Sequence, residues 1–437
     1  MRKSISRLAL LAVVVVFAVT ACGPKATPVP TAAVVVTEAP VVTEAPVVTE
    51  VPTTAPAAGF TIPDIVTGKF NVALVNIGYA SDGGWSQAHT EGALWMATQD
   101  PNINVQYLEA VFPGPDAESV MRSLARKGFD MIIGATLEYG PTMATLAEEF
   151  PNVYWLHDTG YRSNGTNYGN LMGAIEDMKY LAGMVAGARA IADGNTKFGY
   201  VAPWPVPEVI RLGNAFMLGA QVTCPECTME VRWINTWYDP DKEKQAAQSM
   251  LDAGVDIILI GSDTPGPLVA AANAGKWAFT YDYINSCSPA PEKCLGTPYW
   301  NWGPTYLSIA HQIQAGTWVP GNDYLDADSG LVGFYGFMEG QTPQPGVPAE
   351  VIPLVQAKLA EMLAGTFTRF DIFTGPIKDN TGAIIVPEGV TLTQEDLEGI
   401  DAATIASFGL TDRTACTICM NWLVEGIQGT IPPMPAP

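Results

Sequence analysis

Phe70-Asn-Val-Ala-Leu-Val-Asn76 leads through the glycine-rich turn Ser81-Asp-Gly-Gly84 into Trp85-Ser-Gln-Ala-His-Thr-Glu-Gly-Ala-Leu-Trp-Met-Ala97. The first stretch is a short apolar run bounded by turn residues, which predicts a buried strand. The last stretch has the residue pattern of a helix. A buried strand that turns directly into a helix is the unit from which α/β proteins are built.

The same alternation continues along the chain in two halves. In the first half we expect strands at 105–108, 129–134 and 152–156, and helices at 116–127 and 139–150. In the second half we expect strands at 197–202, 230–234, 255–260 and 277–281, and helices at 177–192, 206–222, 239–253 and 266–274. Apolar strands that alternate with helices predict parallel sheets covered on both faces.

Two such halves predict an α/β protein with two doubly wound lobes, the first at about 69–176 and the second at about 195–298. Both lobes belong to one binding domain at 60–437, whose roughly 380 residues are too many for one hydrophobic core, and the remainder of this domain is expected to cross back and complete the lobes. Ligands of doubly wound sheets bind beyond the carboxyl ends of the strands, so we expect a cleft between the lobes.

The C-terminal part, 343–437, carries weaker patterns and no recognisable chemistry. We expect a helix at 353–365, a hairpin that pairs 370–373 with 382–386, and a capped helix that begins at 392–397. These elements are expected to complete the two lobes.

The N-terminus has the pattern of a bacterial lipoprotein signal. Arg2, Lys3 and Arg7 precede an apolar run, Leu8 to Val19, which is too short to span a bilayer, and small residues then lead to Cys22. The alternative is an ordinary signal peptide that ends near a cysteine. The lipoprotein interpretation makes residues 1–22 the signal with Cys22 lipidated, and predicts a protein anchored to the extracytoplasmic face of the cell membrane.

A tether is expected at 23–59. The block Val-Val-Thr-Glu-Ala-Pro occurs at 35–40 and 41–46, and a variant of it follows at 47–52. A proline every six residues disfavours both helix and sheet, so the segment is predicted to be a disordered or polyproline-like spacer.

The charge of the chain excludes some partners. The formal net charge is −22, and removal of the three basic residues of the signal would make it −25. Such acidity argues against nucleic acid as a partner and against electrostatic attraction to anionic lipid.

Six cysteines beyond Cys22 form three close pairs, which we interpret as disulfides of an exported protein. The pairs are Cys224 with Cys227, Cys287 with Cys294, and Cys416 with Cys419. Two Cys-x-x-Cys pairs could also hold zinc or exchange disulfides, but they lie far apart in the chain, and we expect no metal and no cofactor.

Several motifs together resemble the basic membrane protein family of substrate-binding lipoproteins that serve ABC transporters and include purine nucleoside receptors. The resemblance covers about 70–332 and is carried by Asp82-Gly-Gly-Trp-Ser-Gln-Ala-His-Thr-Glu-Gly92, Tyr180-Leu-Ala-Gly183, Trp237-Tyr-Asp-Pro-Asp-Lys-Glu-Lys244, Ala253-Gly-Val-Asp256, Gly261-Ser-Asp-Thr264, Tyr281-Asp282 and Gly316-Thr-Trp318. It implies a type I periplasmic-binding-protein fold, hinge closure of the two lobes, and delivery of a small ligand to a membrane permease.

The resemblance also implies a site for a flat ring. Trp85 and Trp237 occupy the positions from which the family's purine receptors stack an aromatic ring on the base, with Tyr238 as an alternative to Trp237. Asp82 and Ser86 belong to the same motif as Trp85. The alternative role of a tryptophan after Gly-Gly is to anchor the core.

Acidic residues at strand ends are the expected hydrogen-bond acceptors of the ligand. Asp158, Asp263 and Asp282 each follow an expected strand, and the resemblance places Asp158 and Asp282 at ligand-contacting positions. Helix N-capping is the alternative role, above all for Asp263.

One departure from the family bears on the ligand. Nucleoside-binding members carry a lysine that contacts the ribose, and the matching region, 297–306, contains aromatic residues such as Trp302 and no lysine. This favours a free purine base over a nucleoside. Packing at the hinge is the alternative role of Trp300 and Trp302.

An enzyme is disfavoured by the scarcity of catalytic patterns. His89, His157 and His311 are scattered and have no partner at metal-ligand spacing, and nucleophile-elbow and Walker A motifs are absent. We expect a monomeric binding protein that works with an ABC permease. A sensor that presents its ligand to a membrane partner is the alternative.

Overall fold

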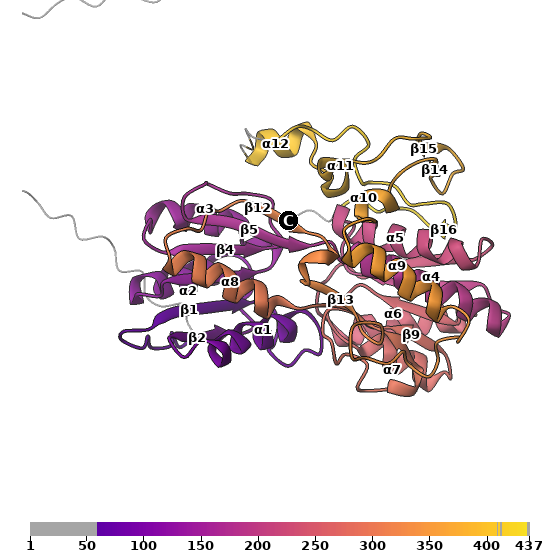
Figure 1. Ribbon diagram of the computed structural model, residues 1–437, viewed down its shortest axis with the longest axis horizontal. Coiled ribbons are helices and arrows are strands. Elements are labelled where there is room, and N and C mark those ends of the chain that lie inside the picture. The colour runs from indigo at the N-terminus through magenta and orange to yellow at the C-terminus, as the bar shows by residue number, and fades with distance from the viewer. Residues whose placement is uncertain (1–58, 409, 411–412, 435–437) are drawn as a thin grey trace, which may run out of the picture. The chain divides into compact units, whose positions relative to one another are not determined.

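The computed structural model describes residues 59–408, 410 and 413–434, all within one compact unit, Thr54–Pro437. The predicted signal, Cys22 and almost all of the predicted tether lie outside the described residues. Two parallel six-stranded sheets form the two lobes, as the alternation of strands and helices predicts (Figure 1). No helix in the described part of the chain has the length and apolar character needed to cross a membrane.

The sheet of the first lobe has the order β12-β5-β4-β3-β1-β2. Strand β1, which lies between β3 and β2, is buried along almost its whole length, which is why its sequence is a largely apolar run. The elements of this lobe are β1 (Phe70–Asn76), α1 (Trp85–Gln99), β2 (Ile103–Leu108), α2 (Pro115–Lys127), β3 (Met131–Ala135), a 3₁₀ turn (Leu137–Tyr139), α3 (Gly140–Glu149), β4 (Tyr154–Asp158), β5 (Tyr168–Gly173), α8 (Trp302–Gln314) and β12 (Asn322–Leu325).

The sheet of the second lobe has the order β10-β9-β8-β6-β7-β16. Its elements are α4 (Ile175–Asp193), β6 (Lys197–Ala202), α5 (Pro207–Thr223), β7 (Thr228–Trp233), α6 (Pro240–Asp252), β8 (Ile257–Ile260), α7 (Gly266–Asn273), β9 (Trp277–Phe279), β10 (Cys294–Gly296), α9 (Ile352–Leu363) and β16 (Ile427–Gln428). A short antiparallel pair, β11 (Pro298–Trp300) with β13 (Val332–Phe334), adjoins α4.

Helices α4 and α5 pack closely because glycines face the neighbouring backbone. A β-carbon on Gly183 would overlap the carbonyl oxygen of Phe216, and one on Gly219 would overlap that of Tyr180. Gly183 is the last residue of the Tyr180-Leu-Ala-Gly183 motif, so part of this motif serves helix packing.

The chain returns to the first lobe after completing most of the second. Helix α8 packs on α1, and β12 joins the edge of the first sheet, where Asn170 Nδ2 donates to Asn322 Oδ1 at 2.8 Å (Figure 1). The lobes are therefore joined by several crossing segments, as in a hinged protein. Single short strands such as β5 and β12 were not recognised from the sequence.

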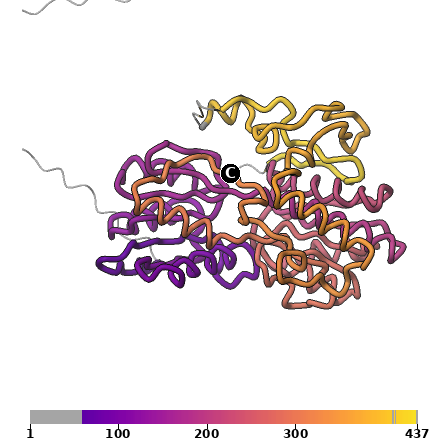
Figure 2. The backbone as a smooth tube through the Cα atoms, in the orientation of Figure 1, coloured from indigo at the N-terminus to yellow at the C-terminus, as the bar shows by residue number. Residues whose placement is uncertain are grey.

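The C-terminal segment covers α5 of the second lobe and adds the edge strand β16 beside β7 (Figure 2). It contains α10 (Arg369–Ile372), β14 (Ile377–Lys378), β15 (Ile384–Val386), α11 (Gln394–Glu398) and α12 (Ala402–Phe408). Asn214 of α5 binds it with both ends of its amide, since Nδ2 donates to Trp422 O and Oδ1 accepts from Val424 N, each at 2.9 Å.

The expected hairpin in this segment is wrong in one of its strands. Residues 370–373 are mostly helical, in α10, and the partner of β15 is β14. The reason is local, because Asp371 accepts a hydrogen bond from the backbone of Thr368 and closes a helical turn. Four alternating residues are too few to outweigh such a cap.

Candidate functional site

A cavity lies between the two lobes, with about 470 Å³ of empty space when the open solvent at its mouth is included. Its walls come from the carboxyl ends of strands in both sheets and from the start of α5, which is where the two doubly wound lobes were expected to bind a ligand. The lining residues are Ile77, Trp85, Thr136, Leu137, Thr159, Glu208, Val209, Leu212, Trp237, Gly261, Asp263, Tyr281 and Asp282.

Asp282 is held in an uncommon backbone conformation at the cavity wall. Its φ is 68°, in the left-handed region, and Thr159 on the opposite wall has a φ of 73°. Asp282 Oδ1 accepts a hydrogen bond from Trp300 Nε1 at 2.8 Å, whereas its buried Oδ2 has no partner. Strained residues with an unused acceptor are typical of binding sites, since a ligand can supply the missing donor.

Two further polar groups at the cavity have no partner. The hydroxyl of Tyr281 and that of Thr159 are both buried and unpaired. Together with Asp282 Oδ2 they offer one carboxylate acceptor and two hydroxyls, which can donate or accept. This set suits a small neutral ligand with several hydrogen-bonding edges.

Three carboxyl groups line the cavity, and burial is the main cause that raises the pKa of each. They are Glu208, Asp263 and Asp282. Repulsion from Asp282 raises the pKa of Asp263 further, while the hydrogen bond from Trp300 and the charge of Lys179 oppose the rise for Asp282. The concentration of acceptors disfavours an anionic ligand.

Lys179 is a fully buried lysine next to this cavity and was not among the expected site residues. Its Nζ donates to Ile260 O at 2.8 Å and lies 3.4 Å from the centre of the Tyr281 ring. Burial lowers the pKa of Lys179 to about 7, against the attraction of Asp282. The signal in the sequence is a lone lysine in the otherwise mostly apolar helix α4.

Lys179→Met is expected to change how stability depends on pH. The pKa of Lys179 falls from 10.5 to about 7 on folding, so between these values the unfolded chain binds more protons and stability rises with pH. The substitution should flatten the free energy of unfolding between pH 7 and pH 9 by up to about 1.4 kcal/mol per pH unit. Urea titrations across this range measure it.

The control for that experiment is Lys276→Met, because Lys276 is partly exposed and paired with Asp256 at the far end of the second sheet. Parallel pH profiles for wild type and Lys179→Met would show that Lys179 does not titrate as its burial requires.

Trp85 and Trp237 line the cavity from opposite lobes. Trp85 is 8% exposed, its Nε1 donates to Ala135 O at 2.9 Å, and its ring meets Trp300 edge to face. It therefore serves the core and the cavity together. Trp237 is partly exposed, and its Nε1 donates across the cleft to Glu138 Oε1 at 2.8 Å.

Asp82, Ser86 and Tyr238 are not among the lining residues and lie close behind them. The Asp82 carboxylate accepts from the backbone of Gly84, Ser86 and Gln87 and so fixes the turn that begins α1. Ser86 Oγ accepts from Gly78 N at 3.1 Å. Tyr238 meets Tyr79 edge to face, with ring centres 6.0 Å apart.

Asp158 and Trp302 lie in the interior of the first lobe, also outside the cavity lining. Tyr306 donates its hydroxyl to Asp158 Oδ2 at 2.6 Å, and Trp302 stacks on His89 with ring centres 4.3 Å apart. Burial raises the pKa of Asp158 well above its usual range. These groups support the wall that carries Trp85, since His89 also contacts the Trp85 ring.

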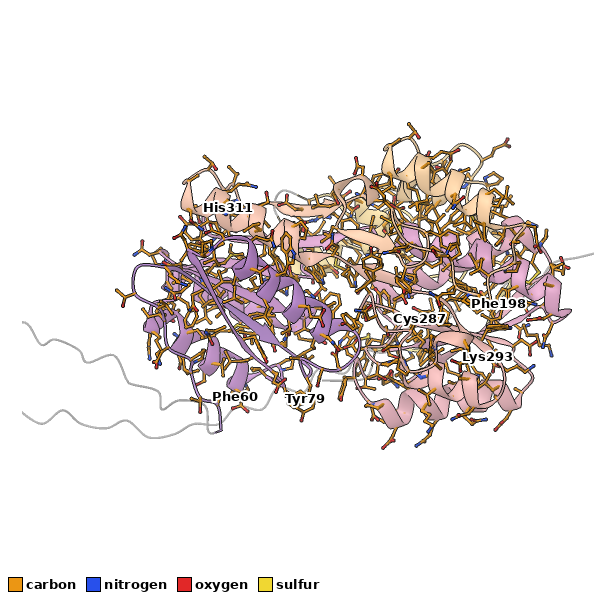
Figure 3. All side chains as sticks on the ribbon, turned by 60° about the horizontal axis from the view of Figure 1, so that its bottom comes forward. Phe60, Tyr79, Phe198, Cys287, Lys293 and His311 are labelled. Atoms are coloured by element: carbon orange, nitrogen blue, oxygen red, sulfur yellow. A yellow bond between two sulfur atoms is a disulfide. The ribbon has the colours of Figure 1, made fainter. Side chains whose placement is uncertain are left out.

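Four of the nine expected ligand residues thus meet at one cavity, and the others stand behind it. The cavity residues are Trp85, Trp237, Asp263 and Asp282. His311 lies on α8 at the surface (Figure 3), where it pairs with Asp100. His89 and His157 are buried in the first lobe, and none of the three histidines lines the cavity. The cysteines are paired as expected, Cys224 with Cys227, Cys287 with Cys294, and Cys416 with Cys419.

The two lobes touch where the turn before α1 meets the loop after β8. Gly84 lies so close to the backbone of Asp263 that a β-carbon would overlap its carbonyl group, and a β-carbon on Gly83 would crowd the side-chain ring of Pro265. The first glycines of the Asp82–Gly92 motif are therefore needed for the lobes to approach each other.

Gly84→Ala is expected to hold the cleft open. The new methyl group would meet a backbone atom of the other lobe, and such overpacking costs about 1–3 kcal/mol of closure. Small-angle scattering should give a larger radius of gyration than that of wild type, and ligand affinity should fall. The matched control is Gly266→Ala, whose β-carbon would meet atoms of its own lobe at 3.2 Å. An unchanged radius would show that this contact does not limit closure.

Comparisons with known proteins agree with this architecture. The family model described as "Bmp: ABC transporter substrate-binding protein PnrA-like" matches residues 69–351. A putative ABC transporter glucose-binding protein of Haloferax volcanii is 36% identical over 67% of the chain and 72% of its own length. A purine-binding protein of Brucella abortus is 32% identical over 76% of the chain and 91% of its own length.

Solved structures show the same fold at lower identity. An ABC transporter solute-binding protein from Conexibacter woesei has a TM-score of 0.55 at 24% identity, covering 68% of the chain and 97% of that protein. One from Aeropyrum pernix has a TM-score of 0.59 at 16% identity, covering 71% and 93%. The two-lobed α/β fold is thereby shown.

Proposed function

Because the chain belongs to the Bmp family of PnrA-like substrate-binding proteins of ABC transporters, we propose that its cavity binds a purine base or a closely related flat heterocycle. The protein is a solute-binding component and not an enzyme. In this proposal the closed protein carries the ligand to a membrane permease.

The observation that carries the proposal is the set of groups around one cavity. Indole rings of Trp85 and Trp237 come from opposite lobes, and the unpaired Oδ2 of Asp282 lies at the same cavity. Two aromatic walls favour a flat ring, since stacking of a base on an aromatic side chain contributes about 1–3 kcal/mol. An acceptor at the edge suits the ring N–H or amino group of a purine.

Relatives point to two ligand classes, which makes a sugar the second candidate. The Brucella relative is a purine-binding protein and the Haloferax relative a putative glucose-binding protein. The three carboxyl groups could also accept hydrogen bonds from sugar hydroxyls. We favour the purine base because no lysine stands in 297–306, where the family's nucleoside-binding members carry one that contacts the ribose, and because aromatic residues bound the cavity on two sides.

A thermal-unfolding screen tests the ligand class. A compound that binds only the folded state raises the unfolding temperature by mass action. Adenine, guanine, hypoxanthine and xanthine are expected to raise it more than the matching nucleosides, glucose or amino acids. A rise with glucose alone would replace the purine by a sugar, and the family would stand.

We also propose that Cys22 carries a lipid that anchors the protein on the extracytoplasmic face of the membrane, with 23–59 as the spacer. The support is the basic start, short apolar run and small residues before Cys22. Cys22→Ala is expected to release the protein from the membrane fraction or to leave it uncleaved. Normal processing with unchanged membrane partition would contradict the anchor. A sensor that presents the ligand to a membrane partner remains the alternative to transport.

A further inference from the structure

Among the side-chain hydrogen bonds that join the lobes, two are donated by aromatic residues of the second lobe to glutamates of the first. Nε1 of Trp237 donates to Oε1 of Glu138, and the hydroxyl of Tyr283 donates to Oε1 of Glu91, both at 2.8 Å. Of these two donors, Trp237 lines the cavity and Tyr283 does not. The first bond therefore touches the binding site as well as the interface of the lobes.

Glu138 connects cavity walls of both lobes. While Oε1 accepts from Trp237, Oε2 accepts from the hydroxyl of Thr136, which also lines the cavity. Glu138 lies on the 3₁₀ turn directly after β3, and the next residue, Tyr139, is fully buried. The carboxylate thus extends from a turn whose backbone is anchored in the first lobe.

The side chain of Trp237 is held less firmly by the second lobe than Glu138 is by the first. Its carbonyl oxygen accepts from Asp263 N at 3.1 Å, which holds the backbone, but the ring is only partly buried. The indole N–H has its hydrogen-bond partner on the opposite lobe. When the lobes separate, that partner moves away and the ring becomes free to change rotamer.

We propose that Glu138 is a positioning residue, which orients the Trp237 ring against the ligand cavity only when the lobes are closed. The Trp237 ring then takes its position at the cavity at the same moment as the cleft closes. The proposal deepens the proposed function and rests on it, because the ring is taken to contact the ligand. A bound ligand excludes water from the cleft and strengthens the bond, which slows reopening.

The first test begins without ligand. In ¹⁵N spectra of the ligand-free full chain, the indole resonance that disappears in Trp237→Phe belongs to Trp237. In Glu138→Ala this resonance should shift and its proton should exchange faster with solvent. In Glu138→Gln it should stay near its wild-type position, because the amide oxygen still accepts the bond. An unchanged resonance in Glu138→Ala, where the wild-type indole proton is protected from exchange, overturns the proposal, and so does a wild-type indole proton of Trp237 that is unprotected in the protein saturated with hypoxanthine.

The second test uses hypoxanthine as the probe and measures its dissociation rate by stopped flow. Glu138→Ala should raise the dissociation rate about threefold to tenfold, because one hydrogen bond usually contributes a free energy of this size. Glu138→Gln should keep the dissociation rate near that of wild type. In a Trp237→Phe background, Glu138→Ala should have no further effect. The same effect in both backgrounds overturns the proposal.

Glu148→Ala is the matched control, since Glu148 is an exposed glutamate of the same lobe on α3. It should leave both the indole resonance and the dissociation rate unchanged. A resonance that responds as expected in a protein that does not bind hypoxanthine supports the positioning role and refutes the purine ligand instead.

Discussion

Asp282→Asn is expected to weaken binding of hypoxanthine about tenfold to a hundredfold. The substitution keeps an oxygen for the bond from Trp300 Nε1, and asparagine tolerates the φ of 68° found here. What it removes is the acceptor Oδ2, which has no protein partner and is proposed to face the ligand, and it puts an amide donor in that place. A buried ligand donor left without its acceptor costs about 1–3 kcal/mol, which gives roughly this range.

The matched control is Asp256→Asn in the same lobe. Asp256 precedes β8 at the end of the sheet opposite the cavity and pairs with Lys276. Its substitution should leave hypoxanthine affinity unchanged in calorimetric titrations. An equal loss in both variants, or no loss in Asp282→Asn, would remove Asp282 from the proposed site.

Trp85→Ala is expected to lower both affinity and stability. Loss of stacking should weaken hypoxanthine binding by about 1–3 kcal/mol, roughly tenfold to a hundredfold. Because Trp85 is only 8% exposed and bonded to Ala135 O, the fold should also lose about 3–5 kcal/mol. Calorimetry and urea unfolding measure the two losses separately.

Trp302→Ala separates the two roles of the aromatic cluster. Trp302 is 1% exposed and stacks on Trp300 and His89 without lining the cavity. It should lose a similar amount of stability and much less affinity, measured where both variants are folded. If Trp302→Ala weakens binding as much as Trp85→Ala, the effect of Trp85 comes from packing, and the stacking role fails.

Strand–helix alternation was enough to predict the two lobes, because each strand of a covered parallel sheet is apolar on both faces and each helix has its own start and stop. The β1 run Phe70–Asn76 and α6, with Asp239 at its N-cap and Pro240 in its first turn, lie where expected. Strands that form where the chain crosses back to the first lobe could not be predicted from this alternation. β12 is only half buried at a sheet edge, and its pairing with β5 depends on residues about 150 positions away.

The candidate site was predicted in part for a similar reason. Residues directly after strands, such as Asp263 and Asp282, reach the cavity because the carboxyl ends of parallel strands meet there. Asp158 is the last residue of β4, but its side chain points into the lobe toward Tyr306. Glu208 and Lys179 come from helices: Glu208 of α5 lines the cavity, and Lys179 of α4, which packs on α5, lies beside it against the ring of Tyr281.

Calorimetric titration of the purified protein with hypoxanthine, inosine and glucose tests the central claim most directly, since it compares a flat base, the same base with ribose, and a sugar. The account predicts saturable binding of hypoxanthine that is tighter than binding of inosine, and no comparable binding of glucose. Tighter binding of inosine would contradict the preference for the base. Tight binding of glucose without hypoxanthine binding would contradict the purine site altogether.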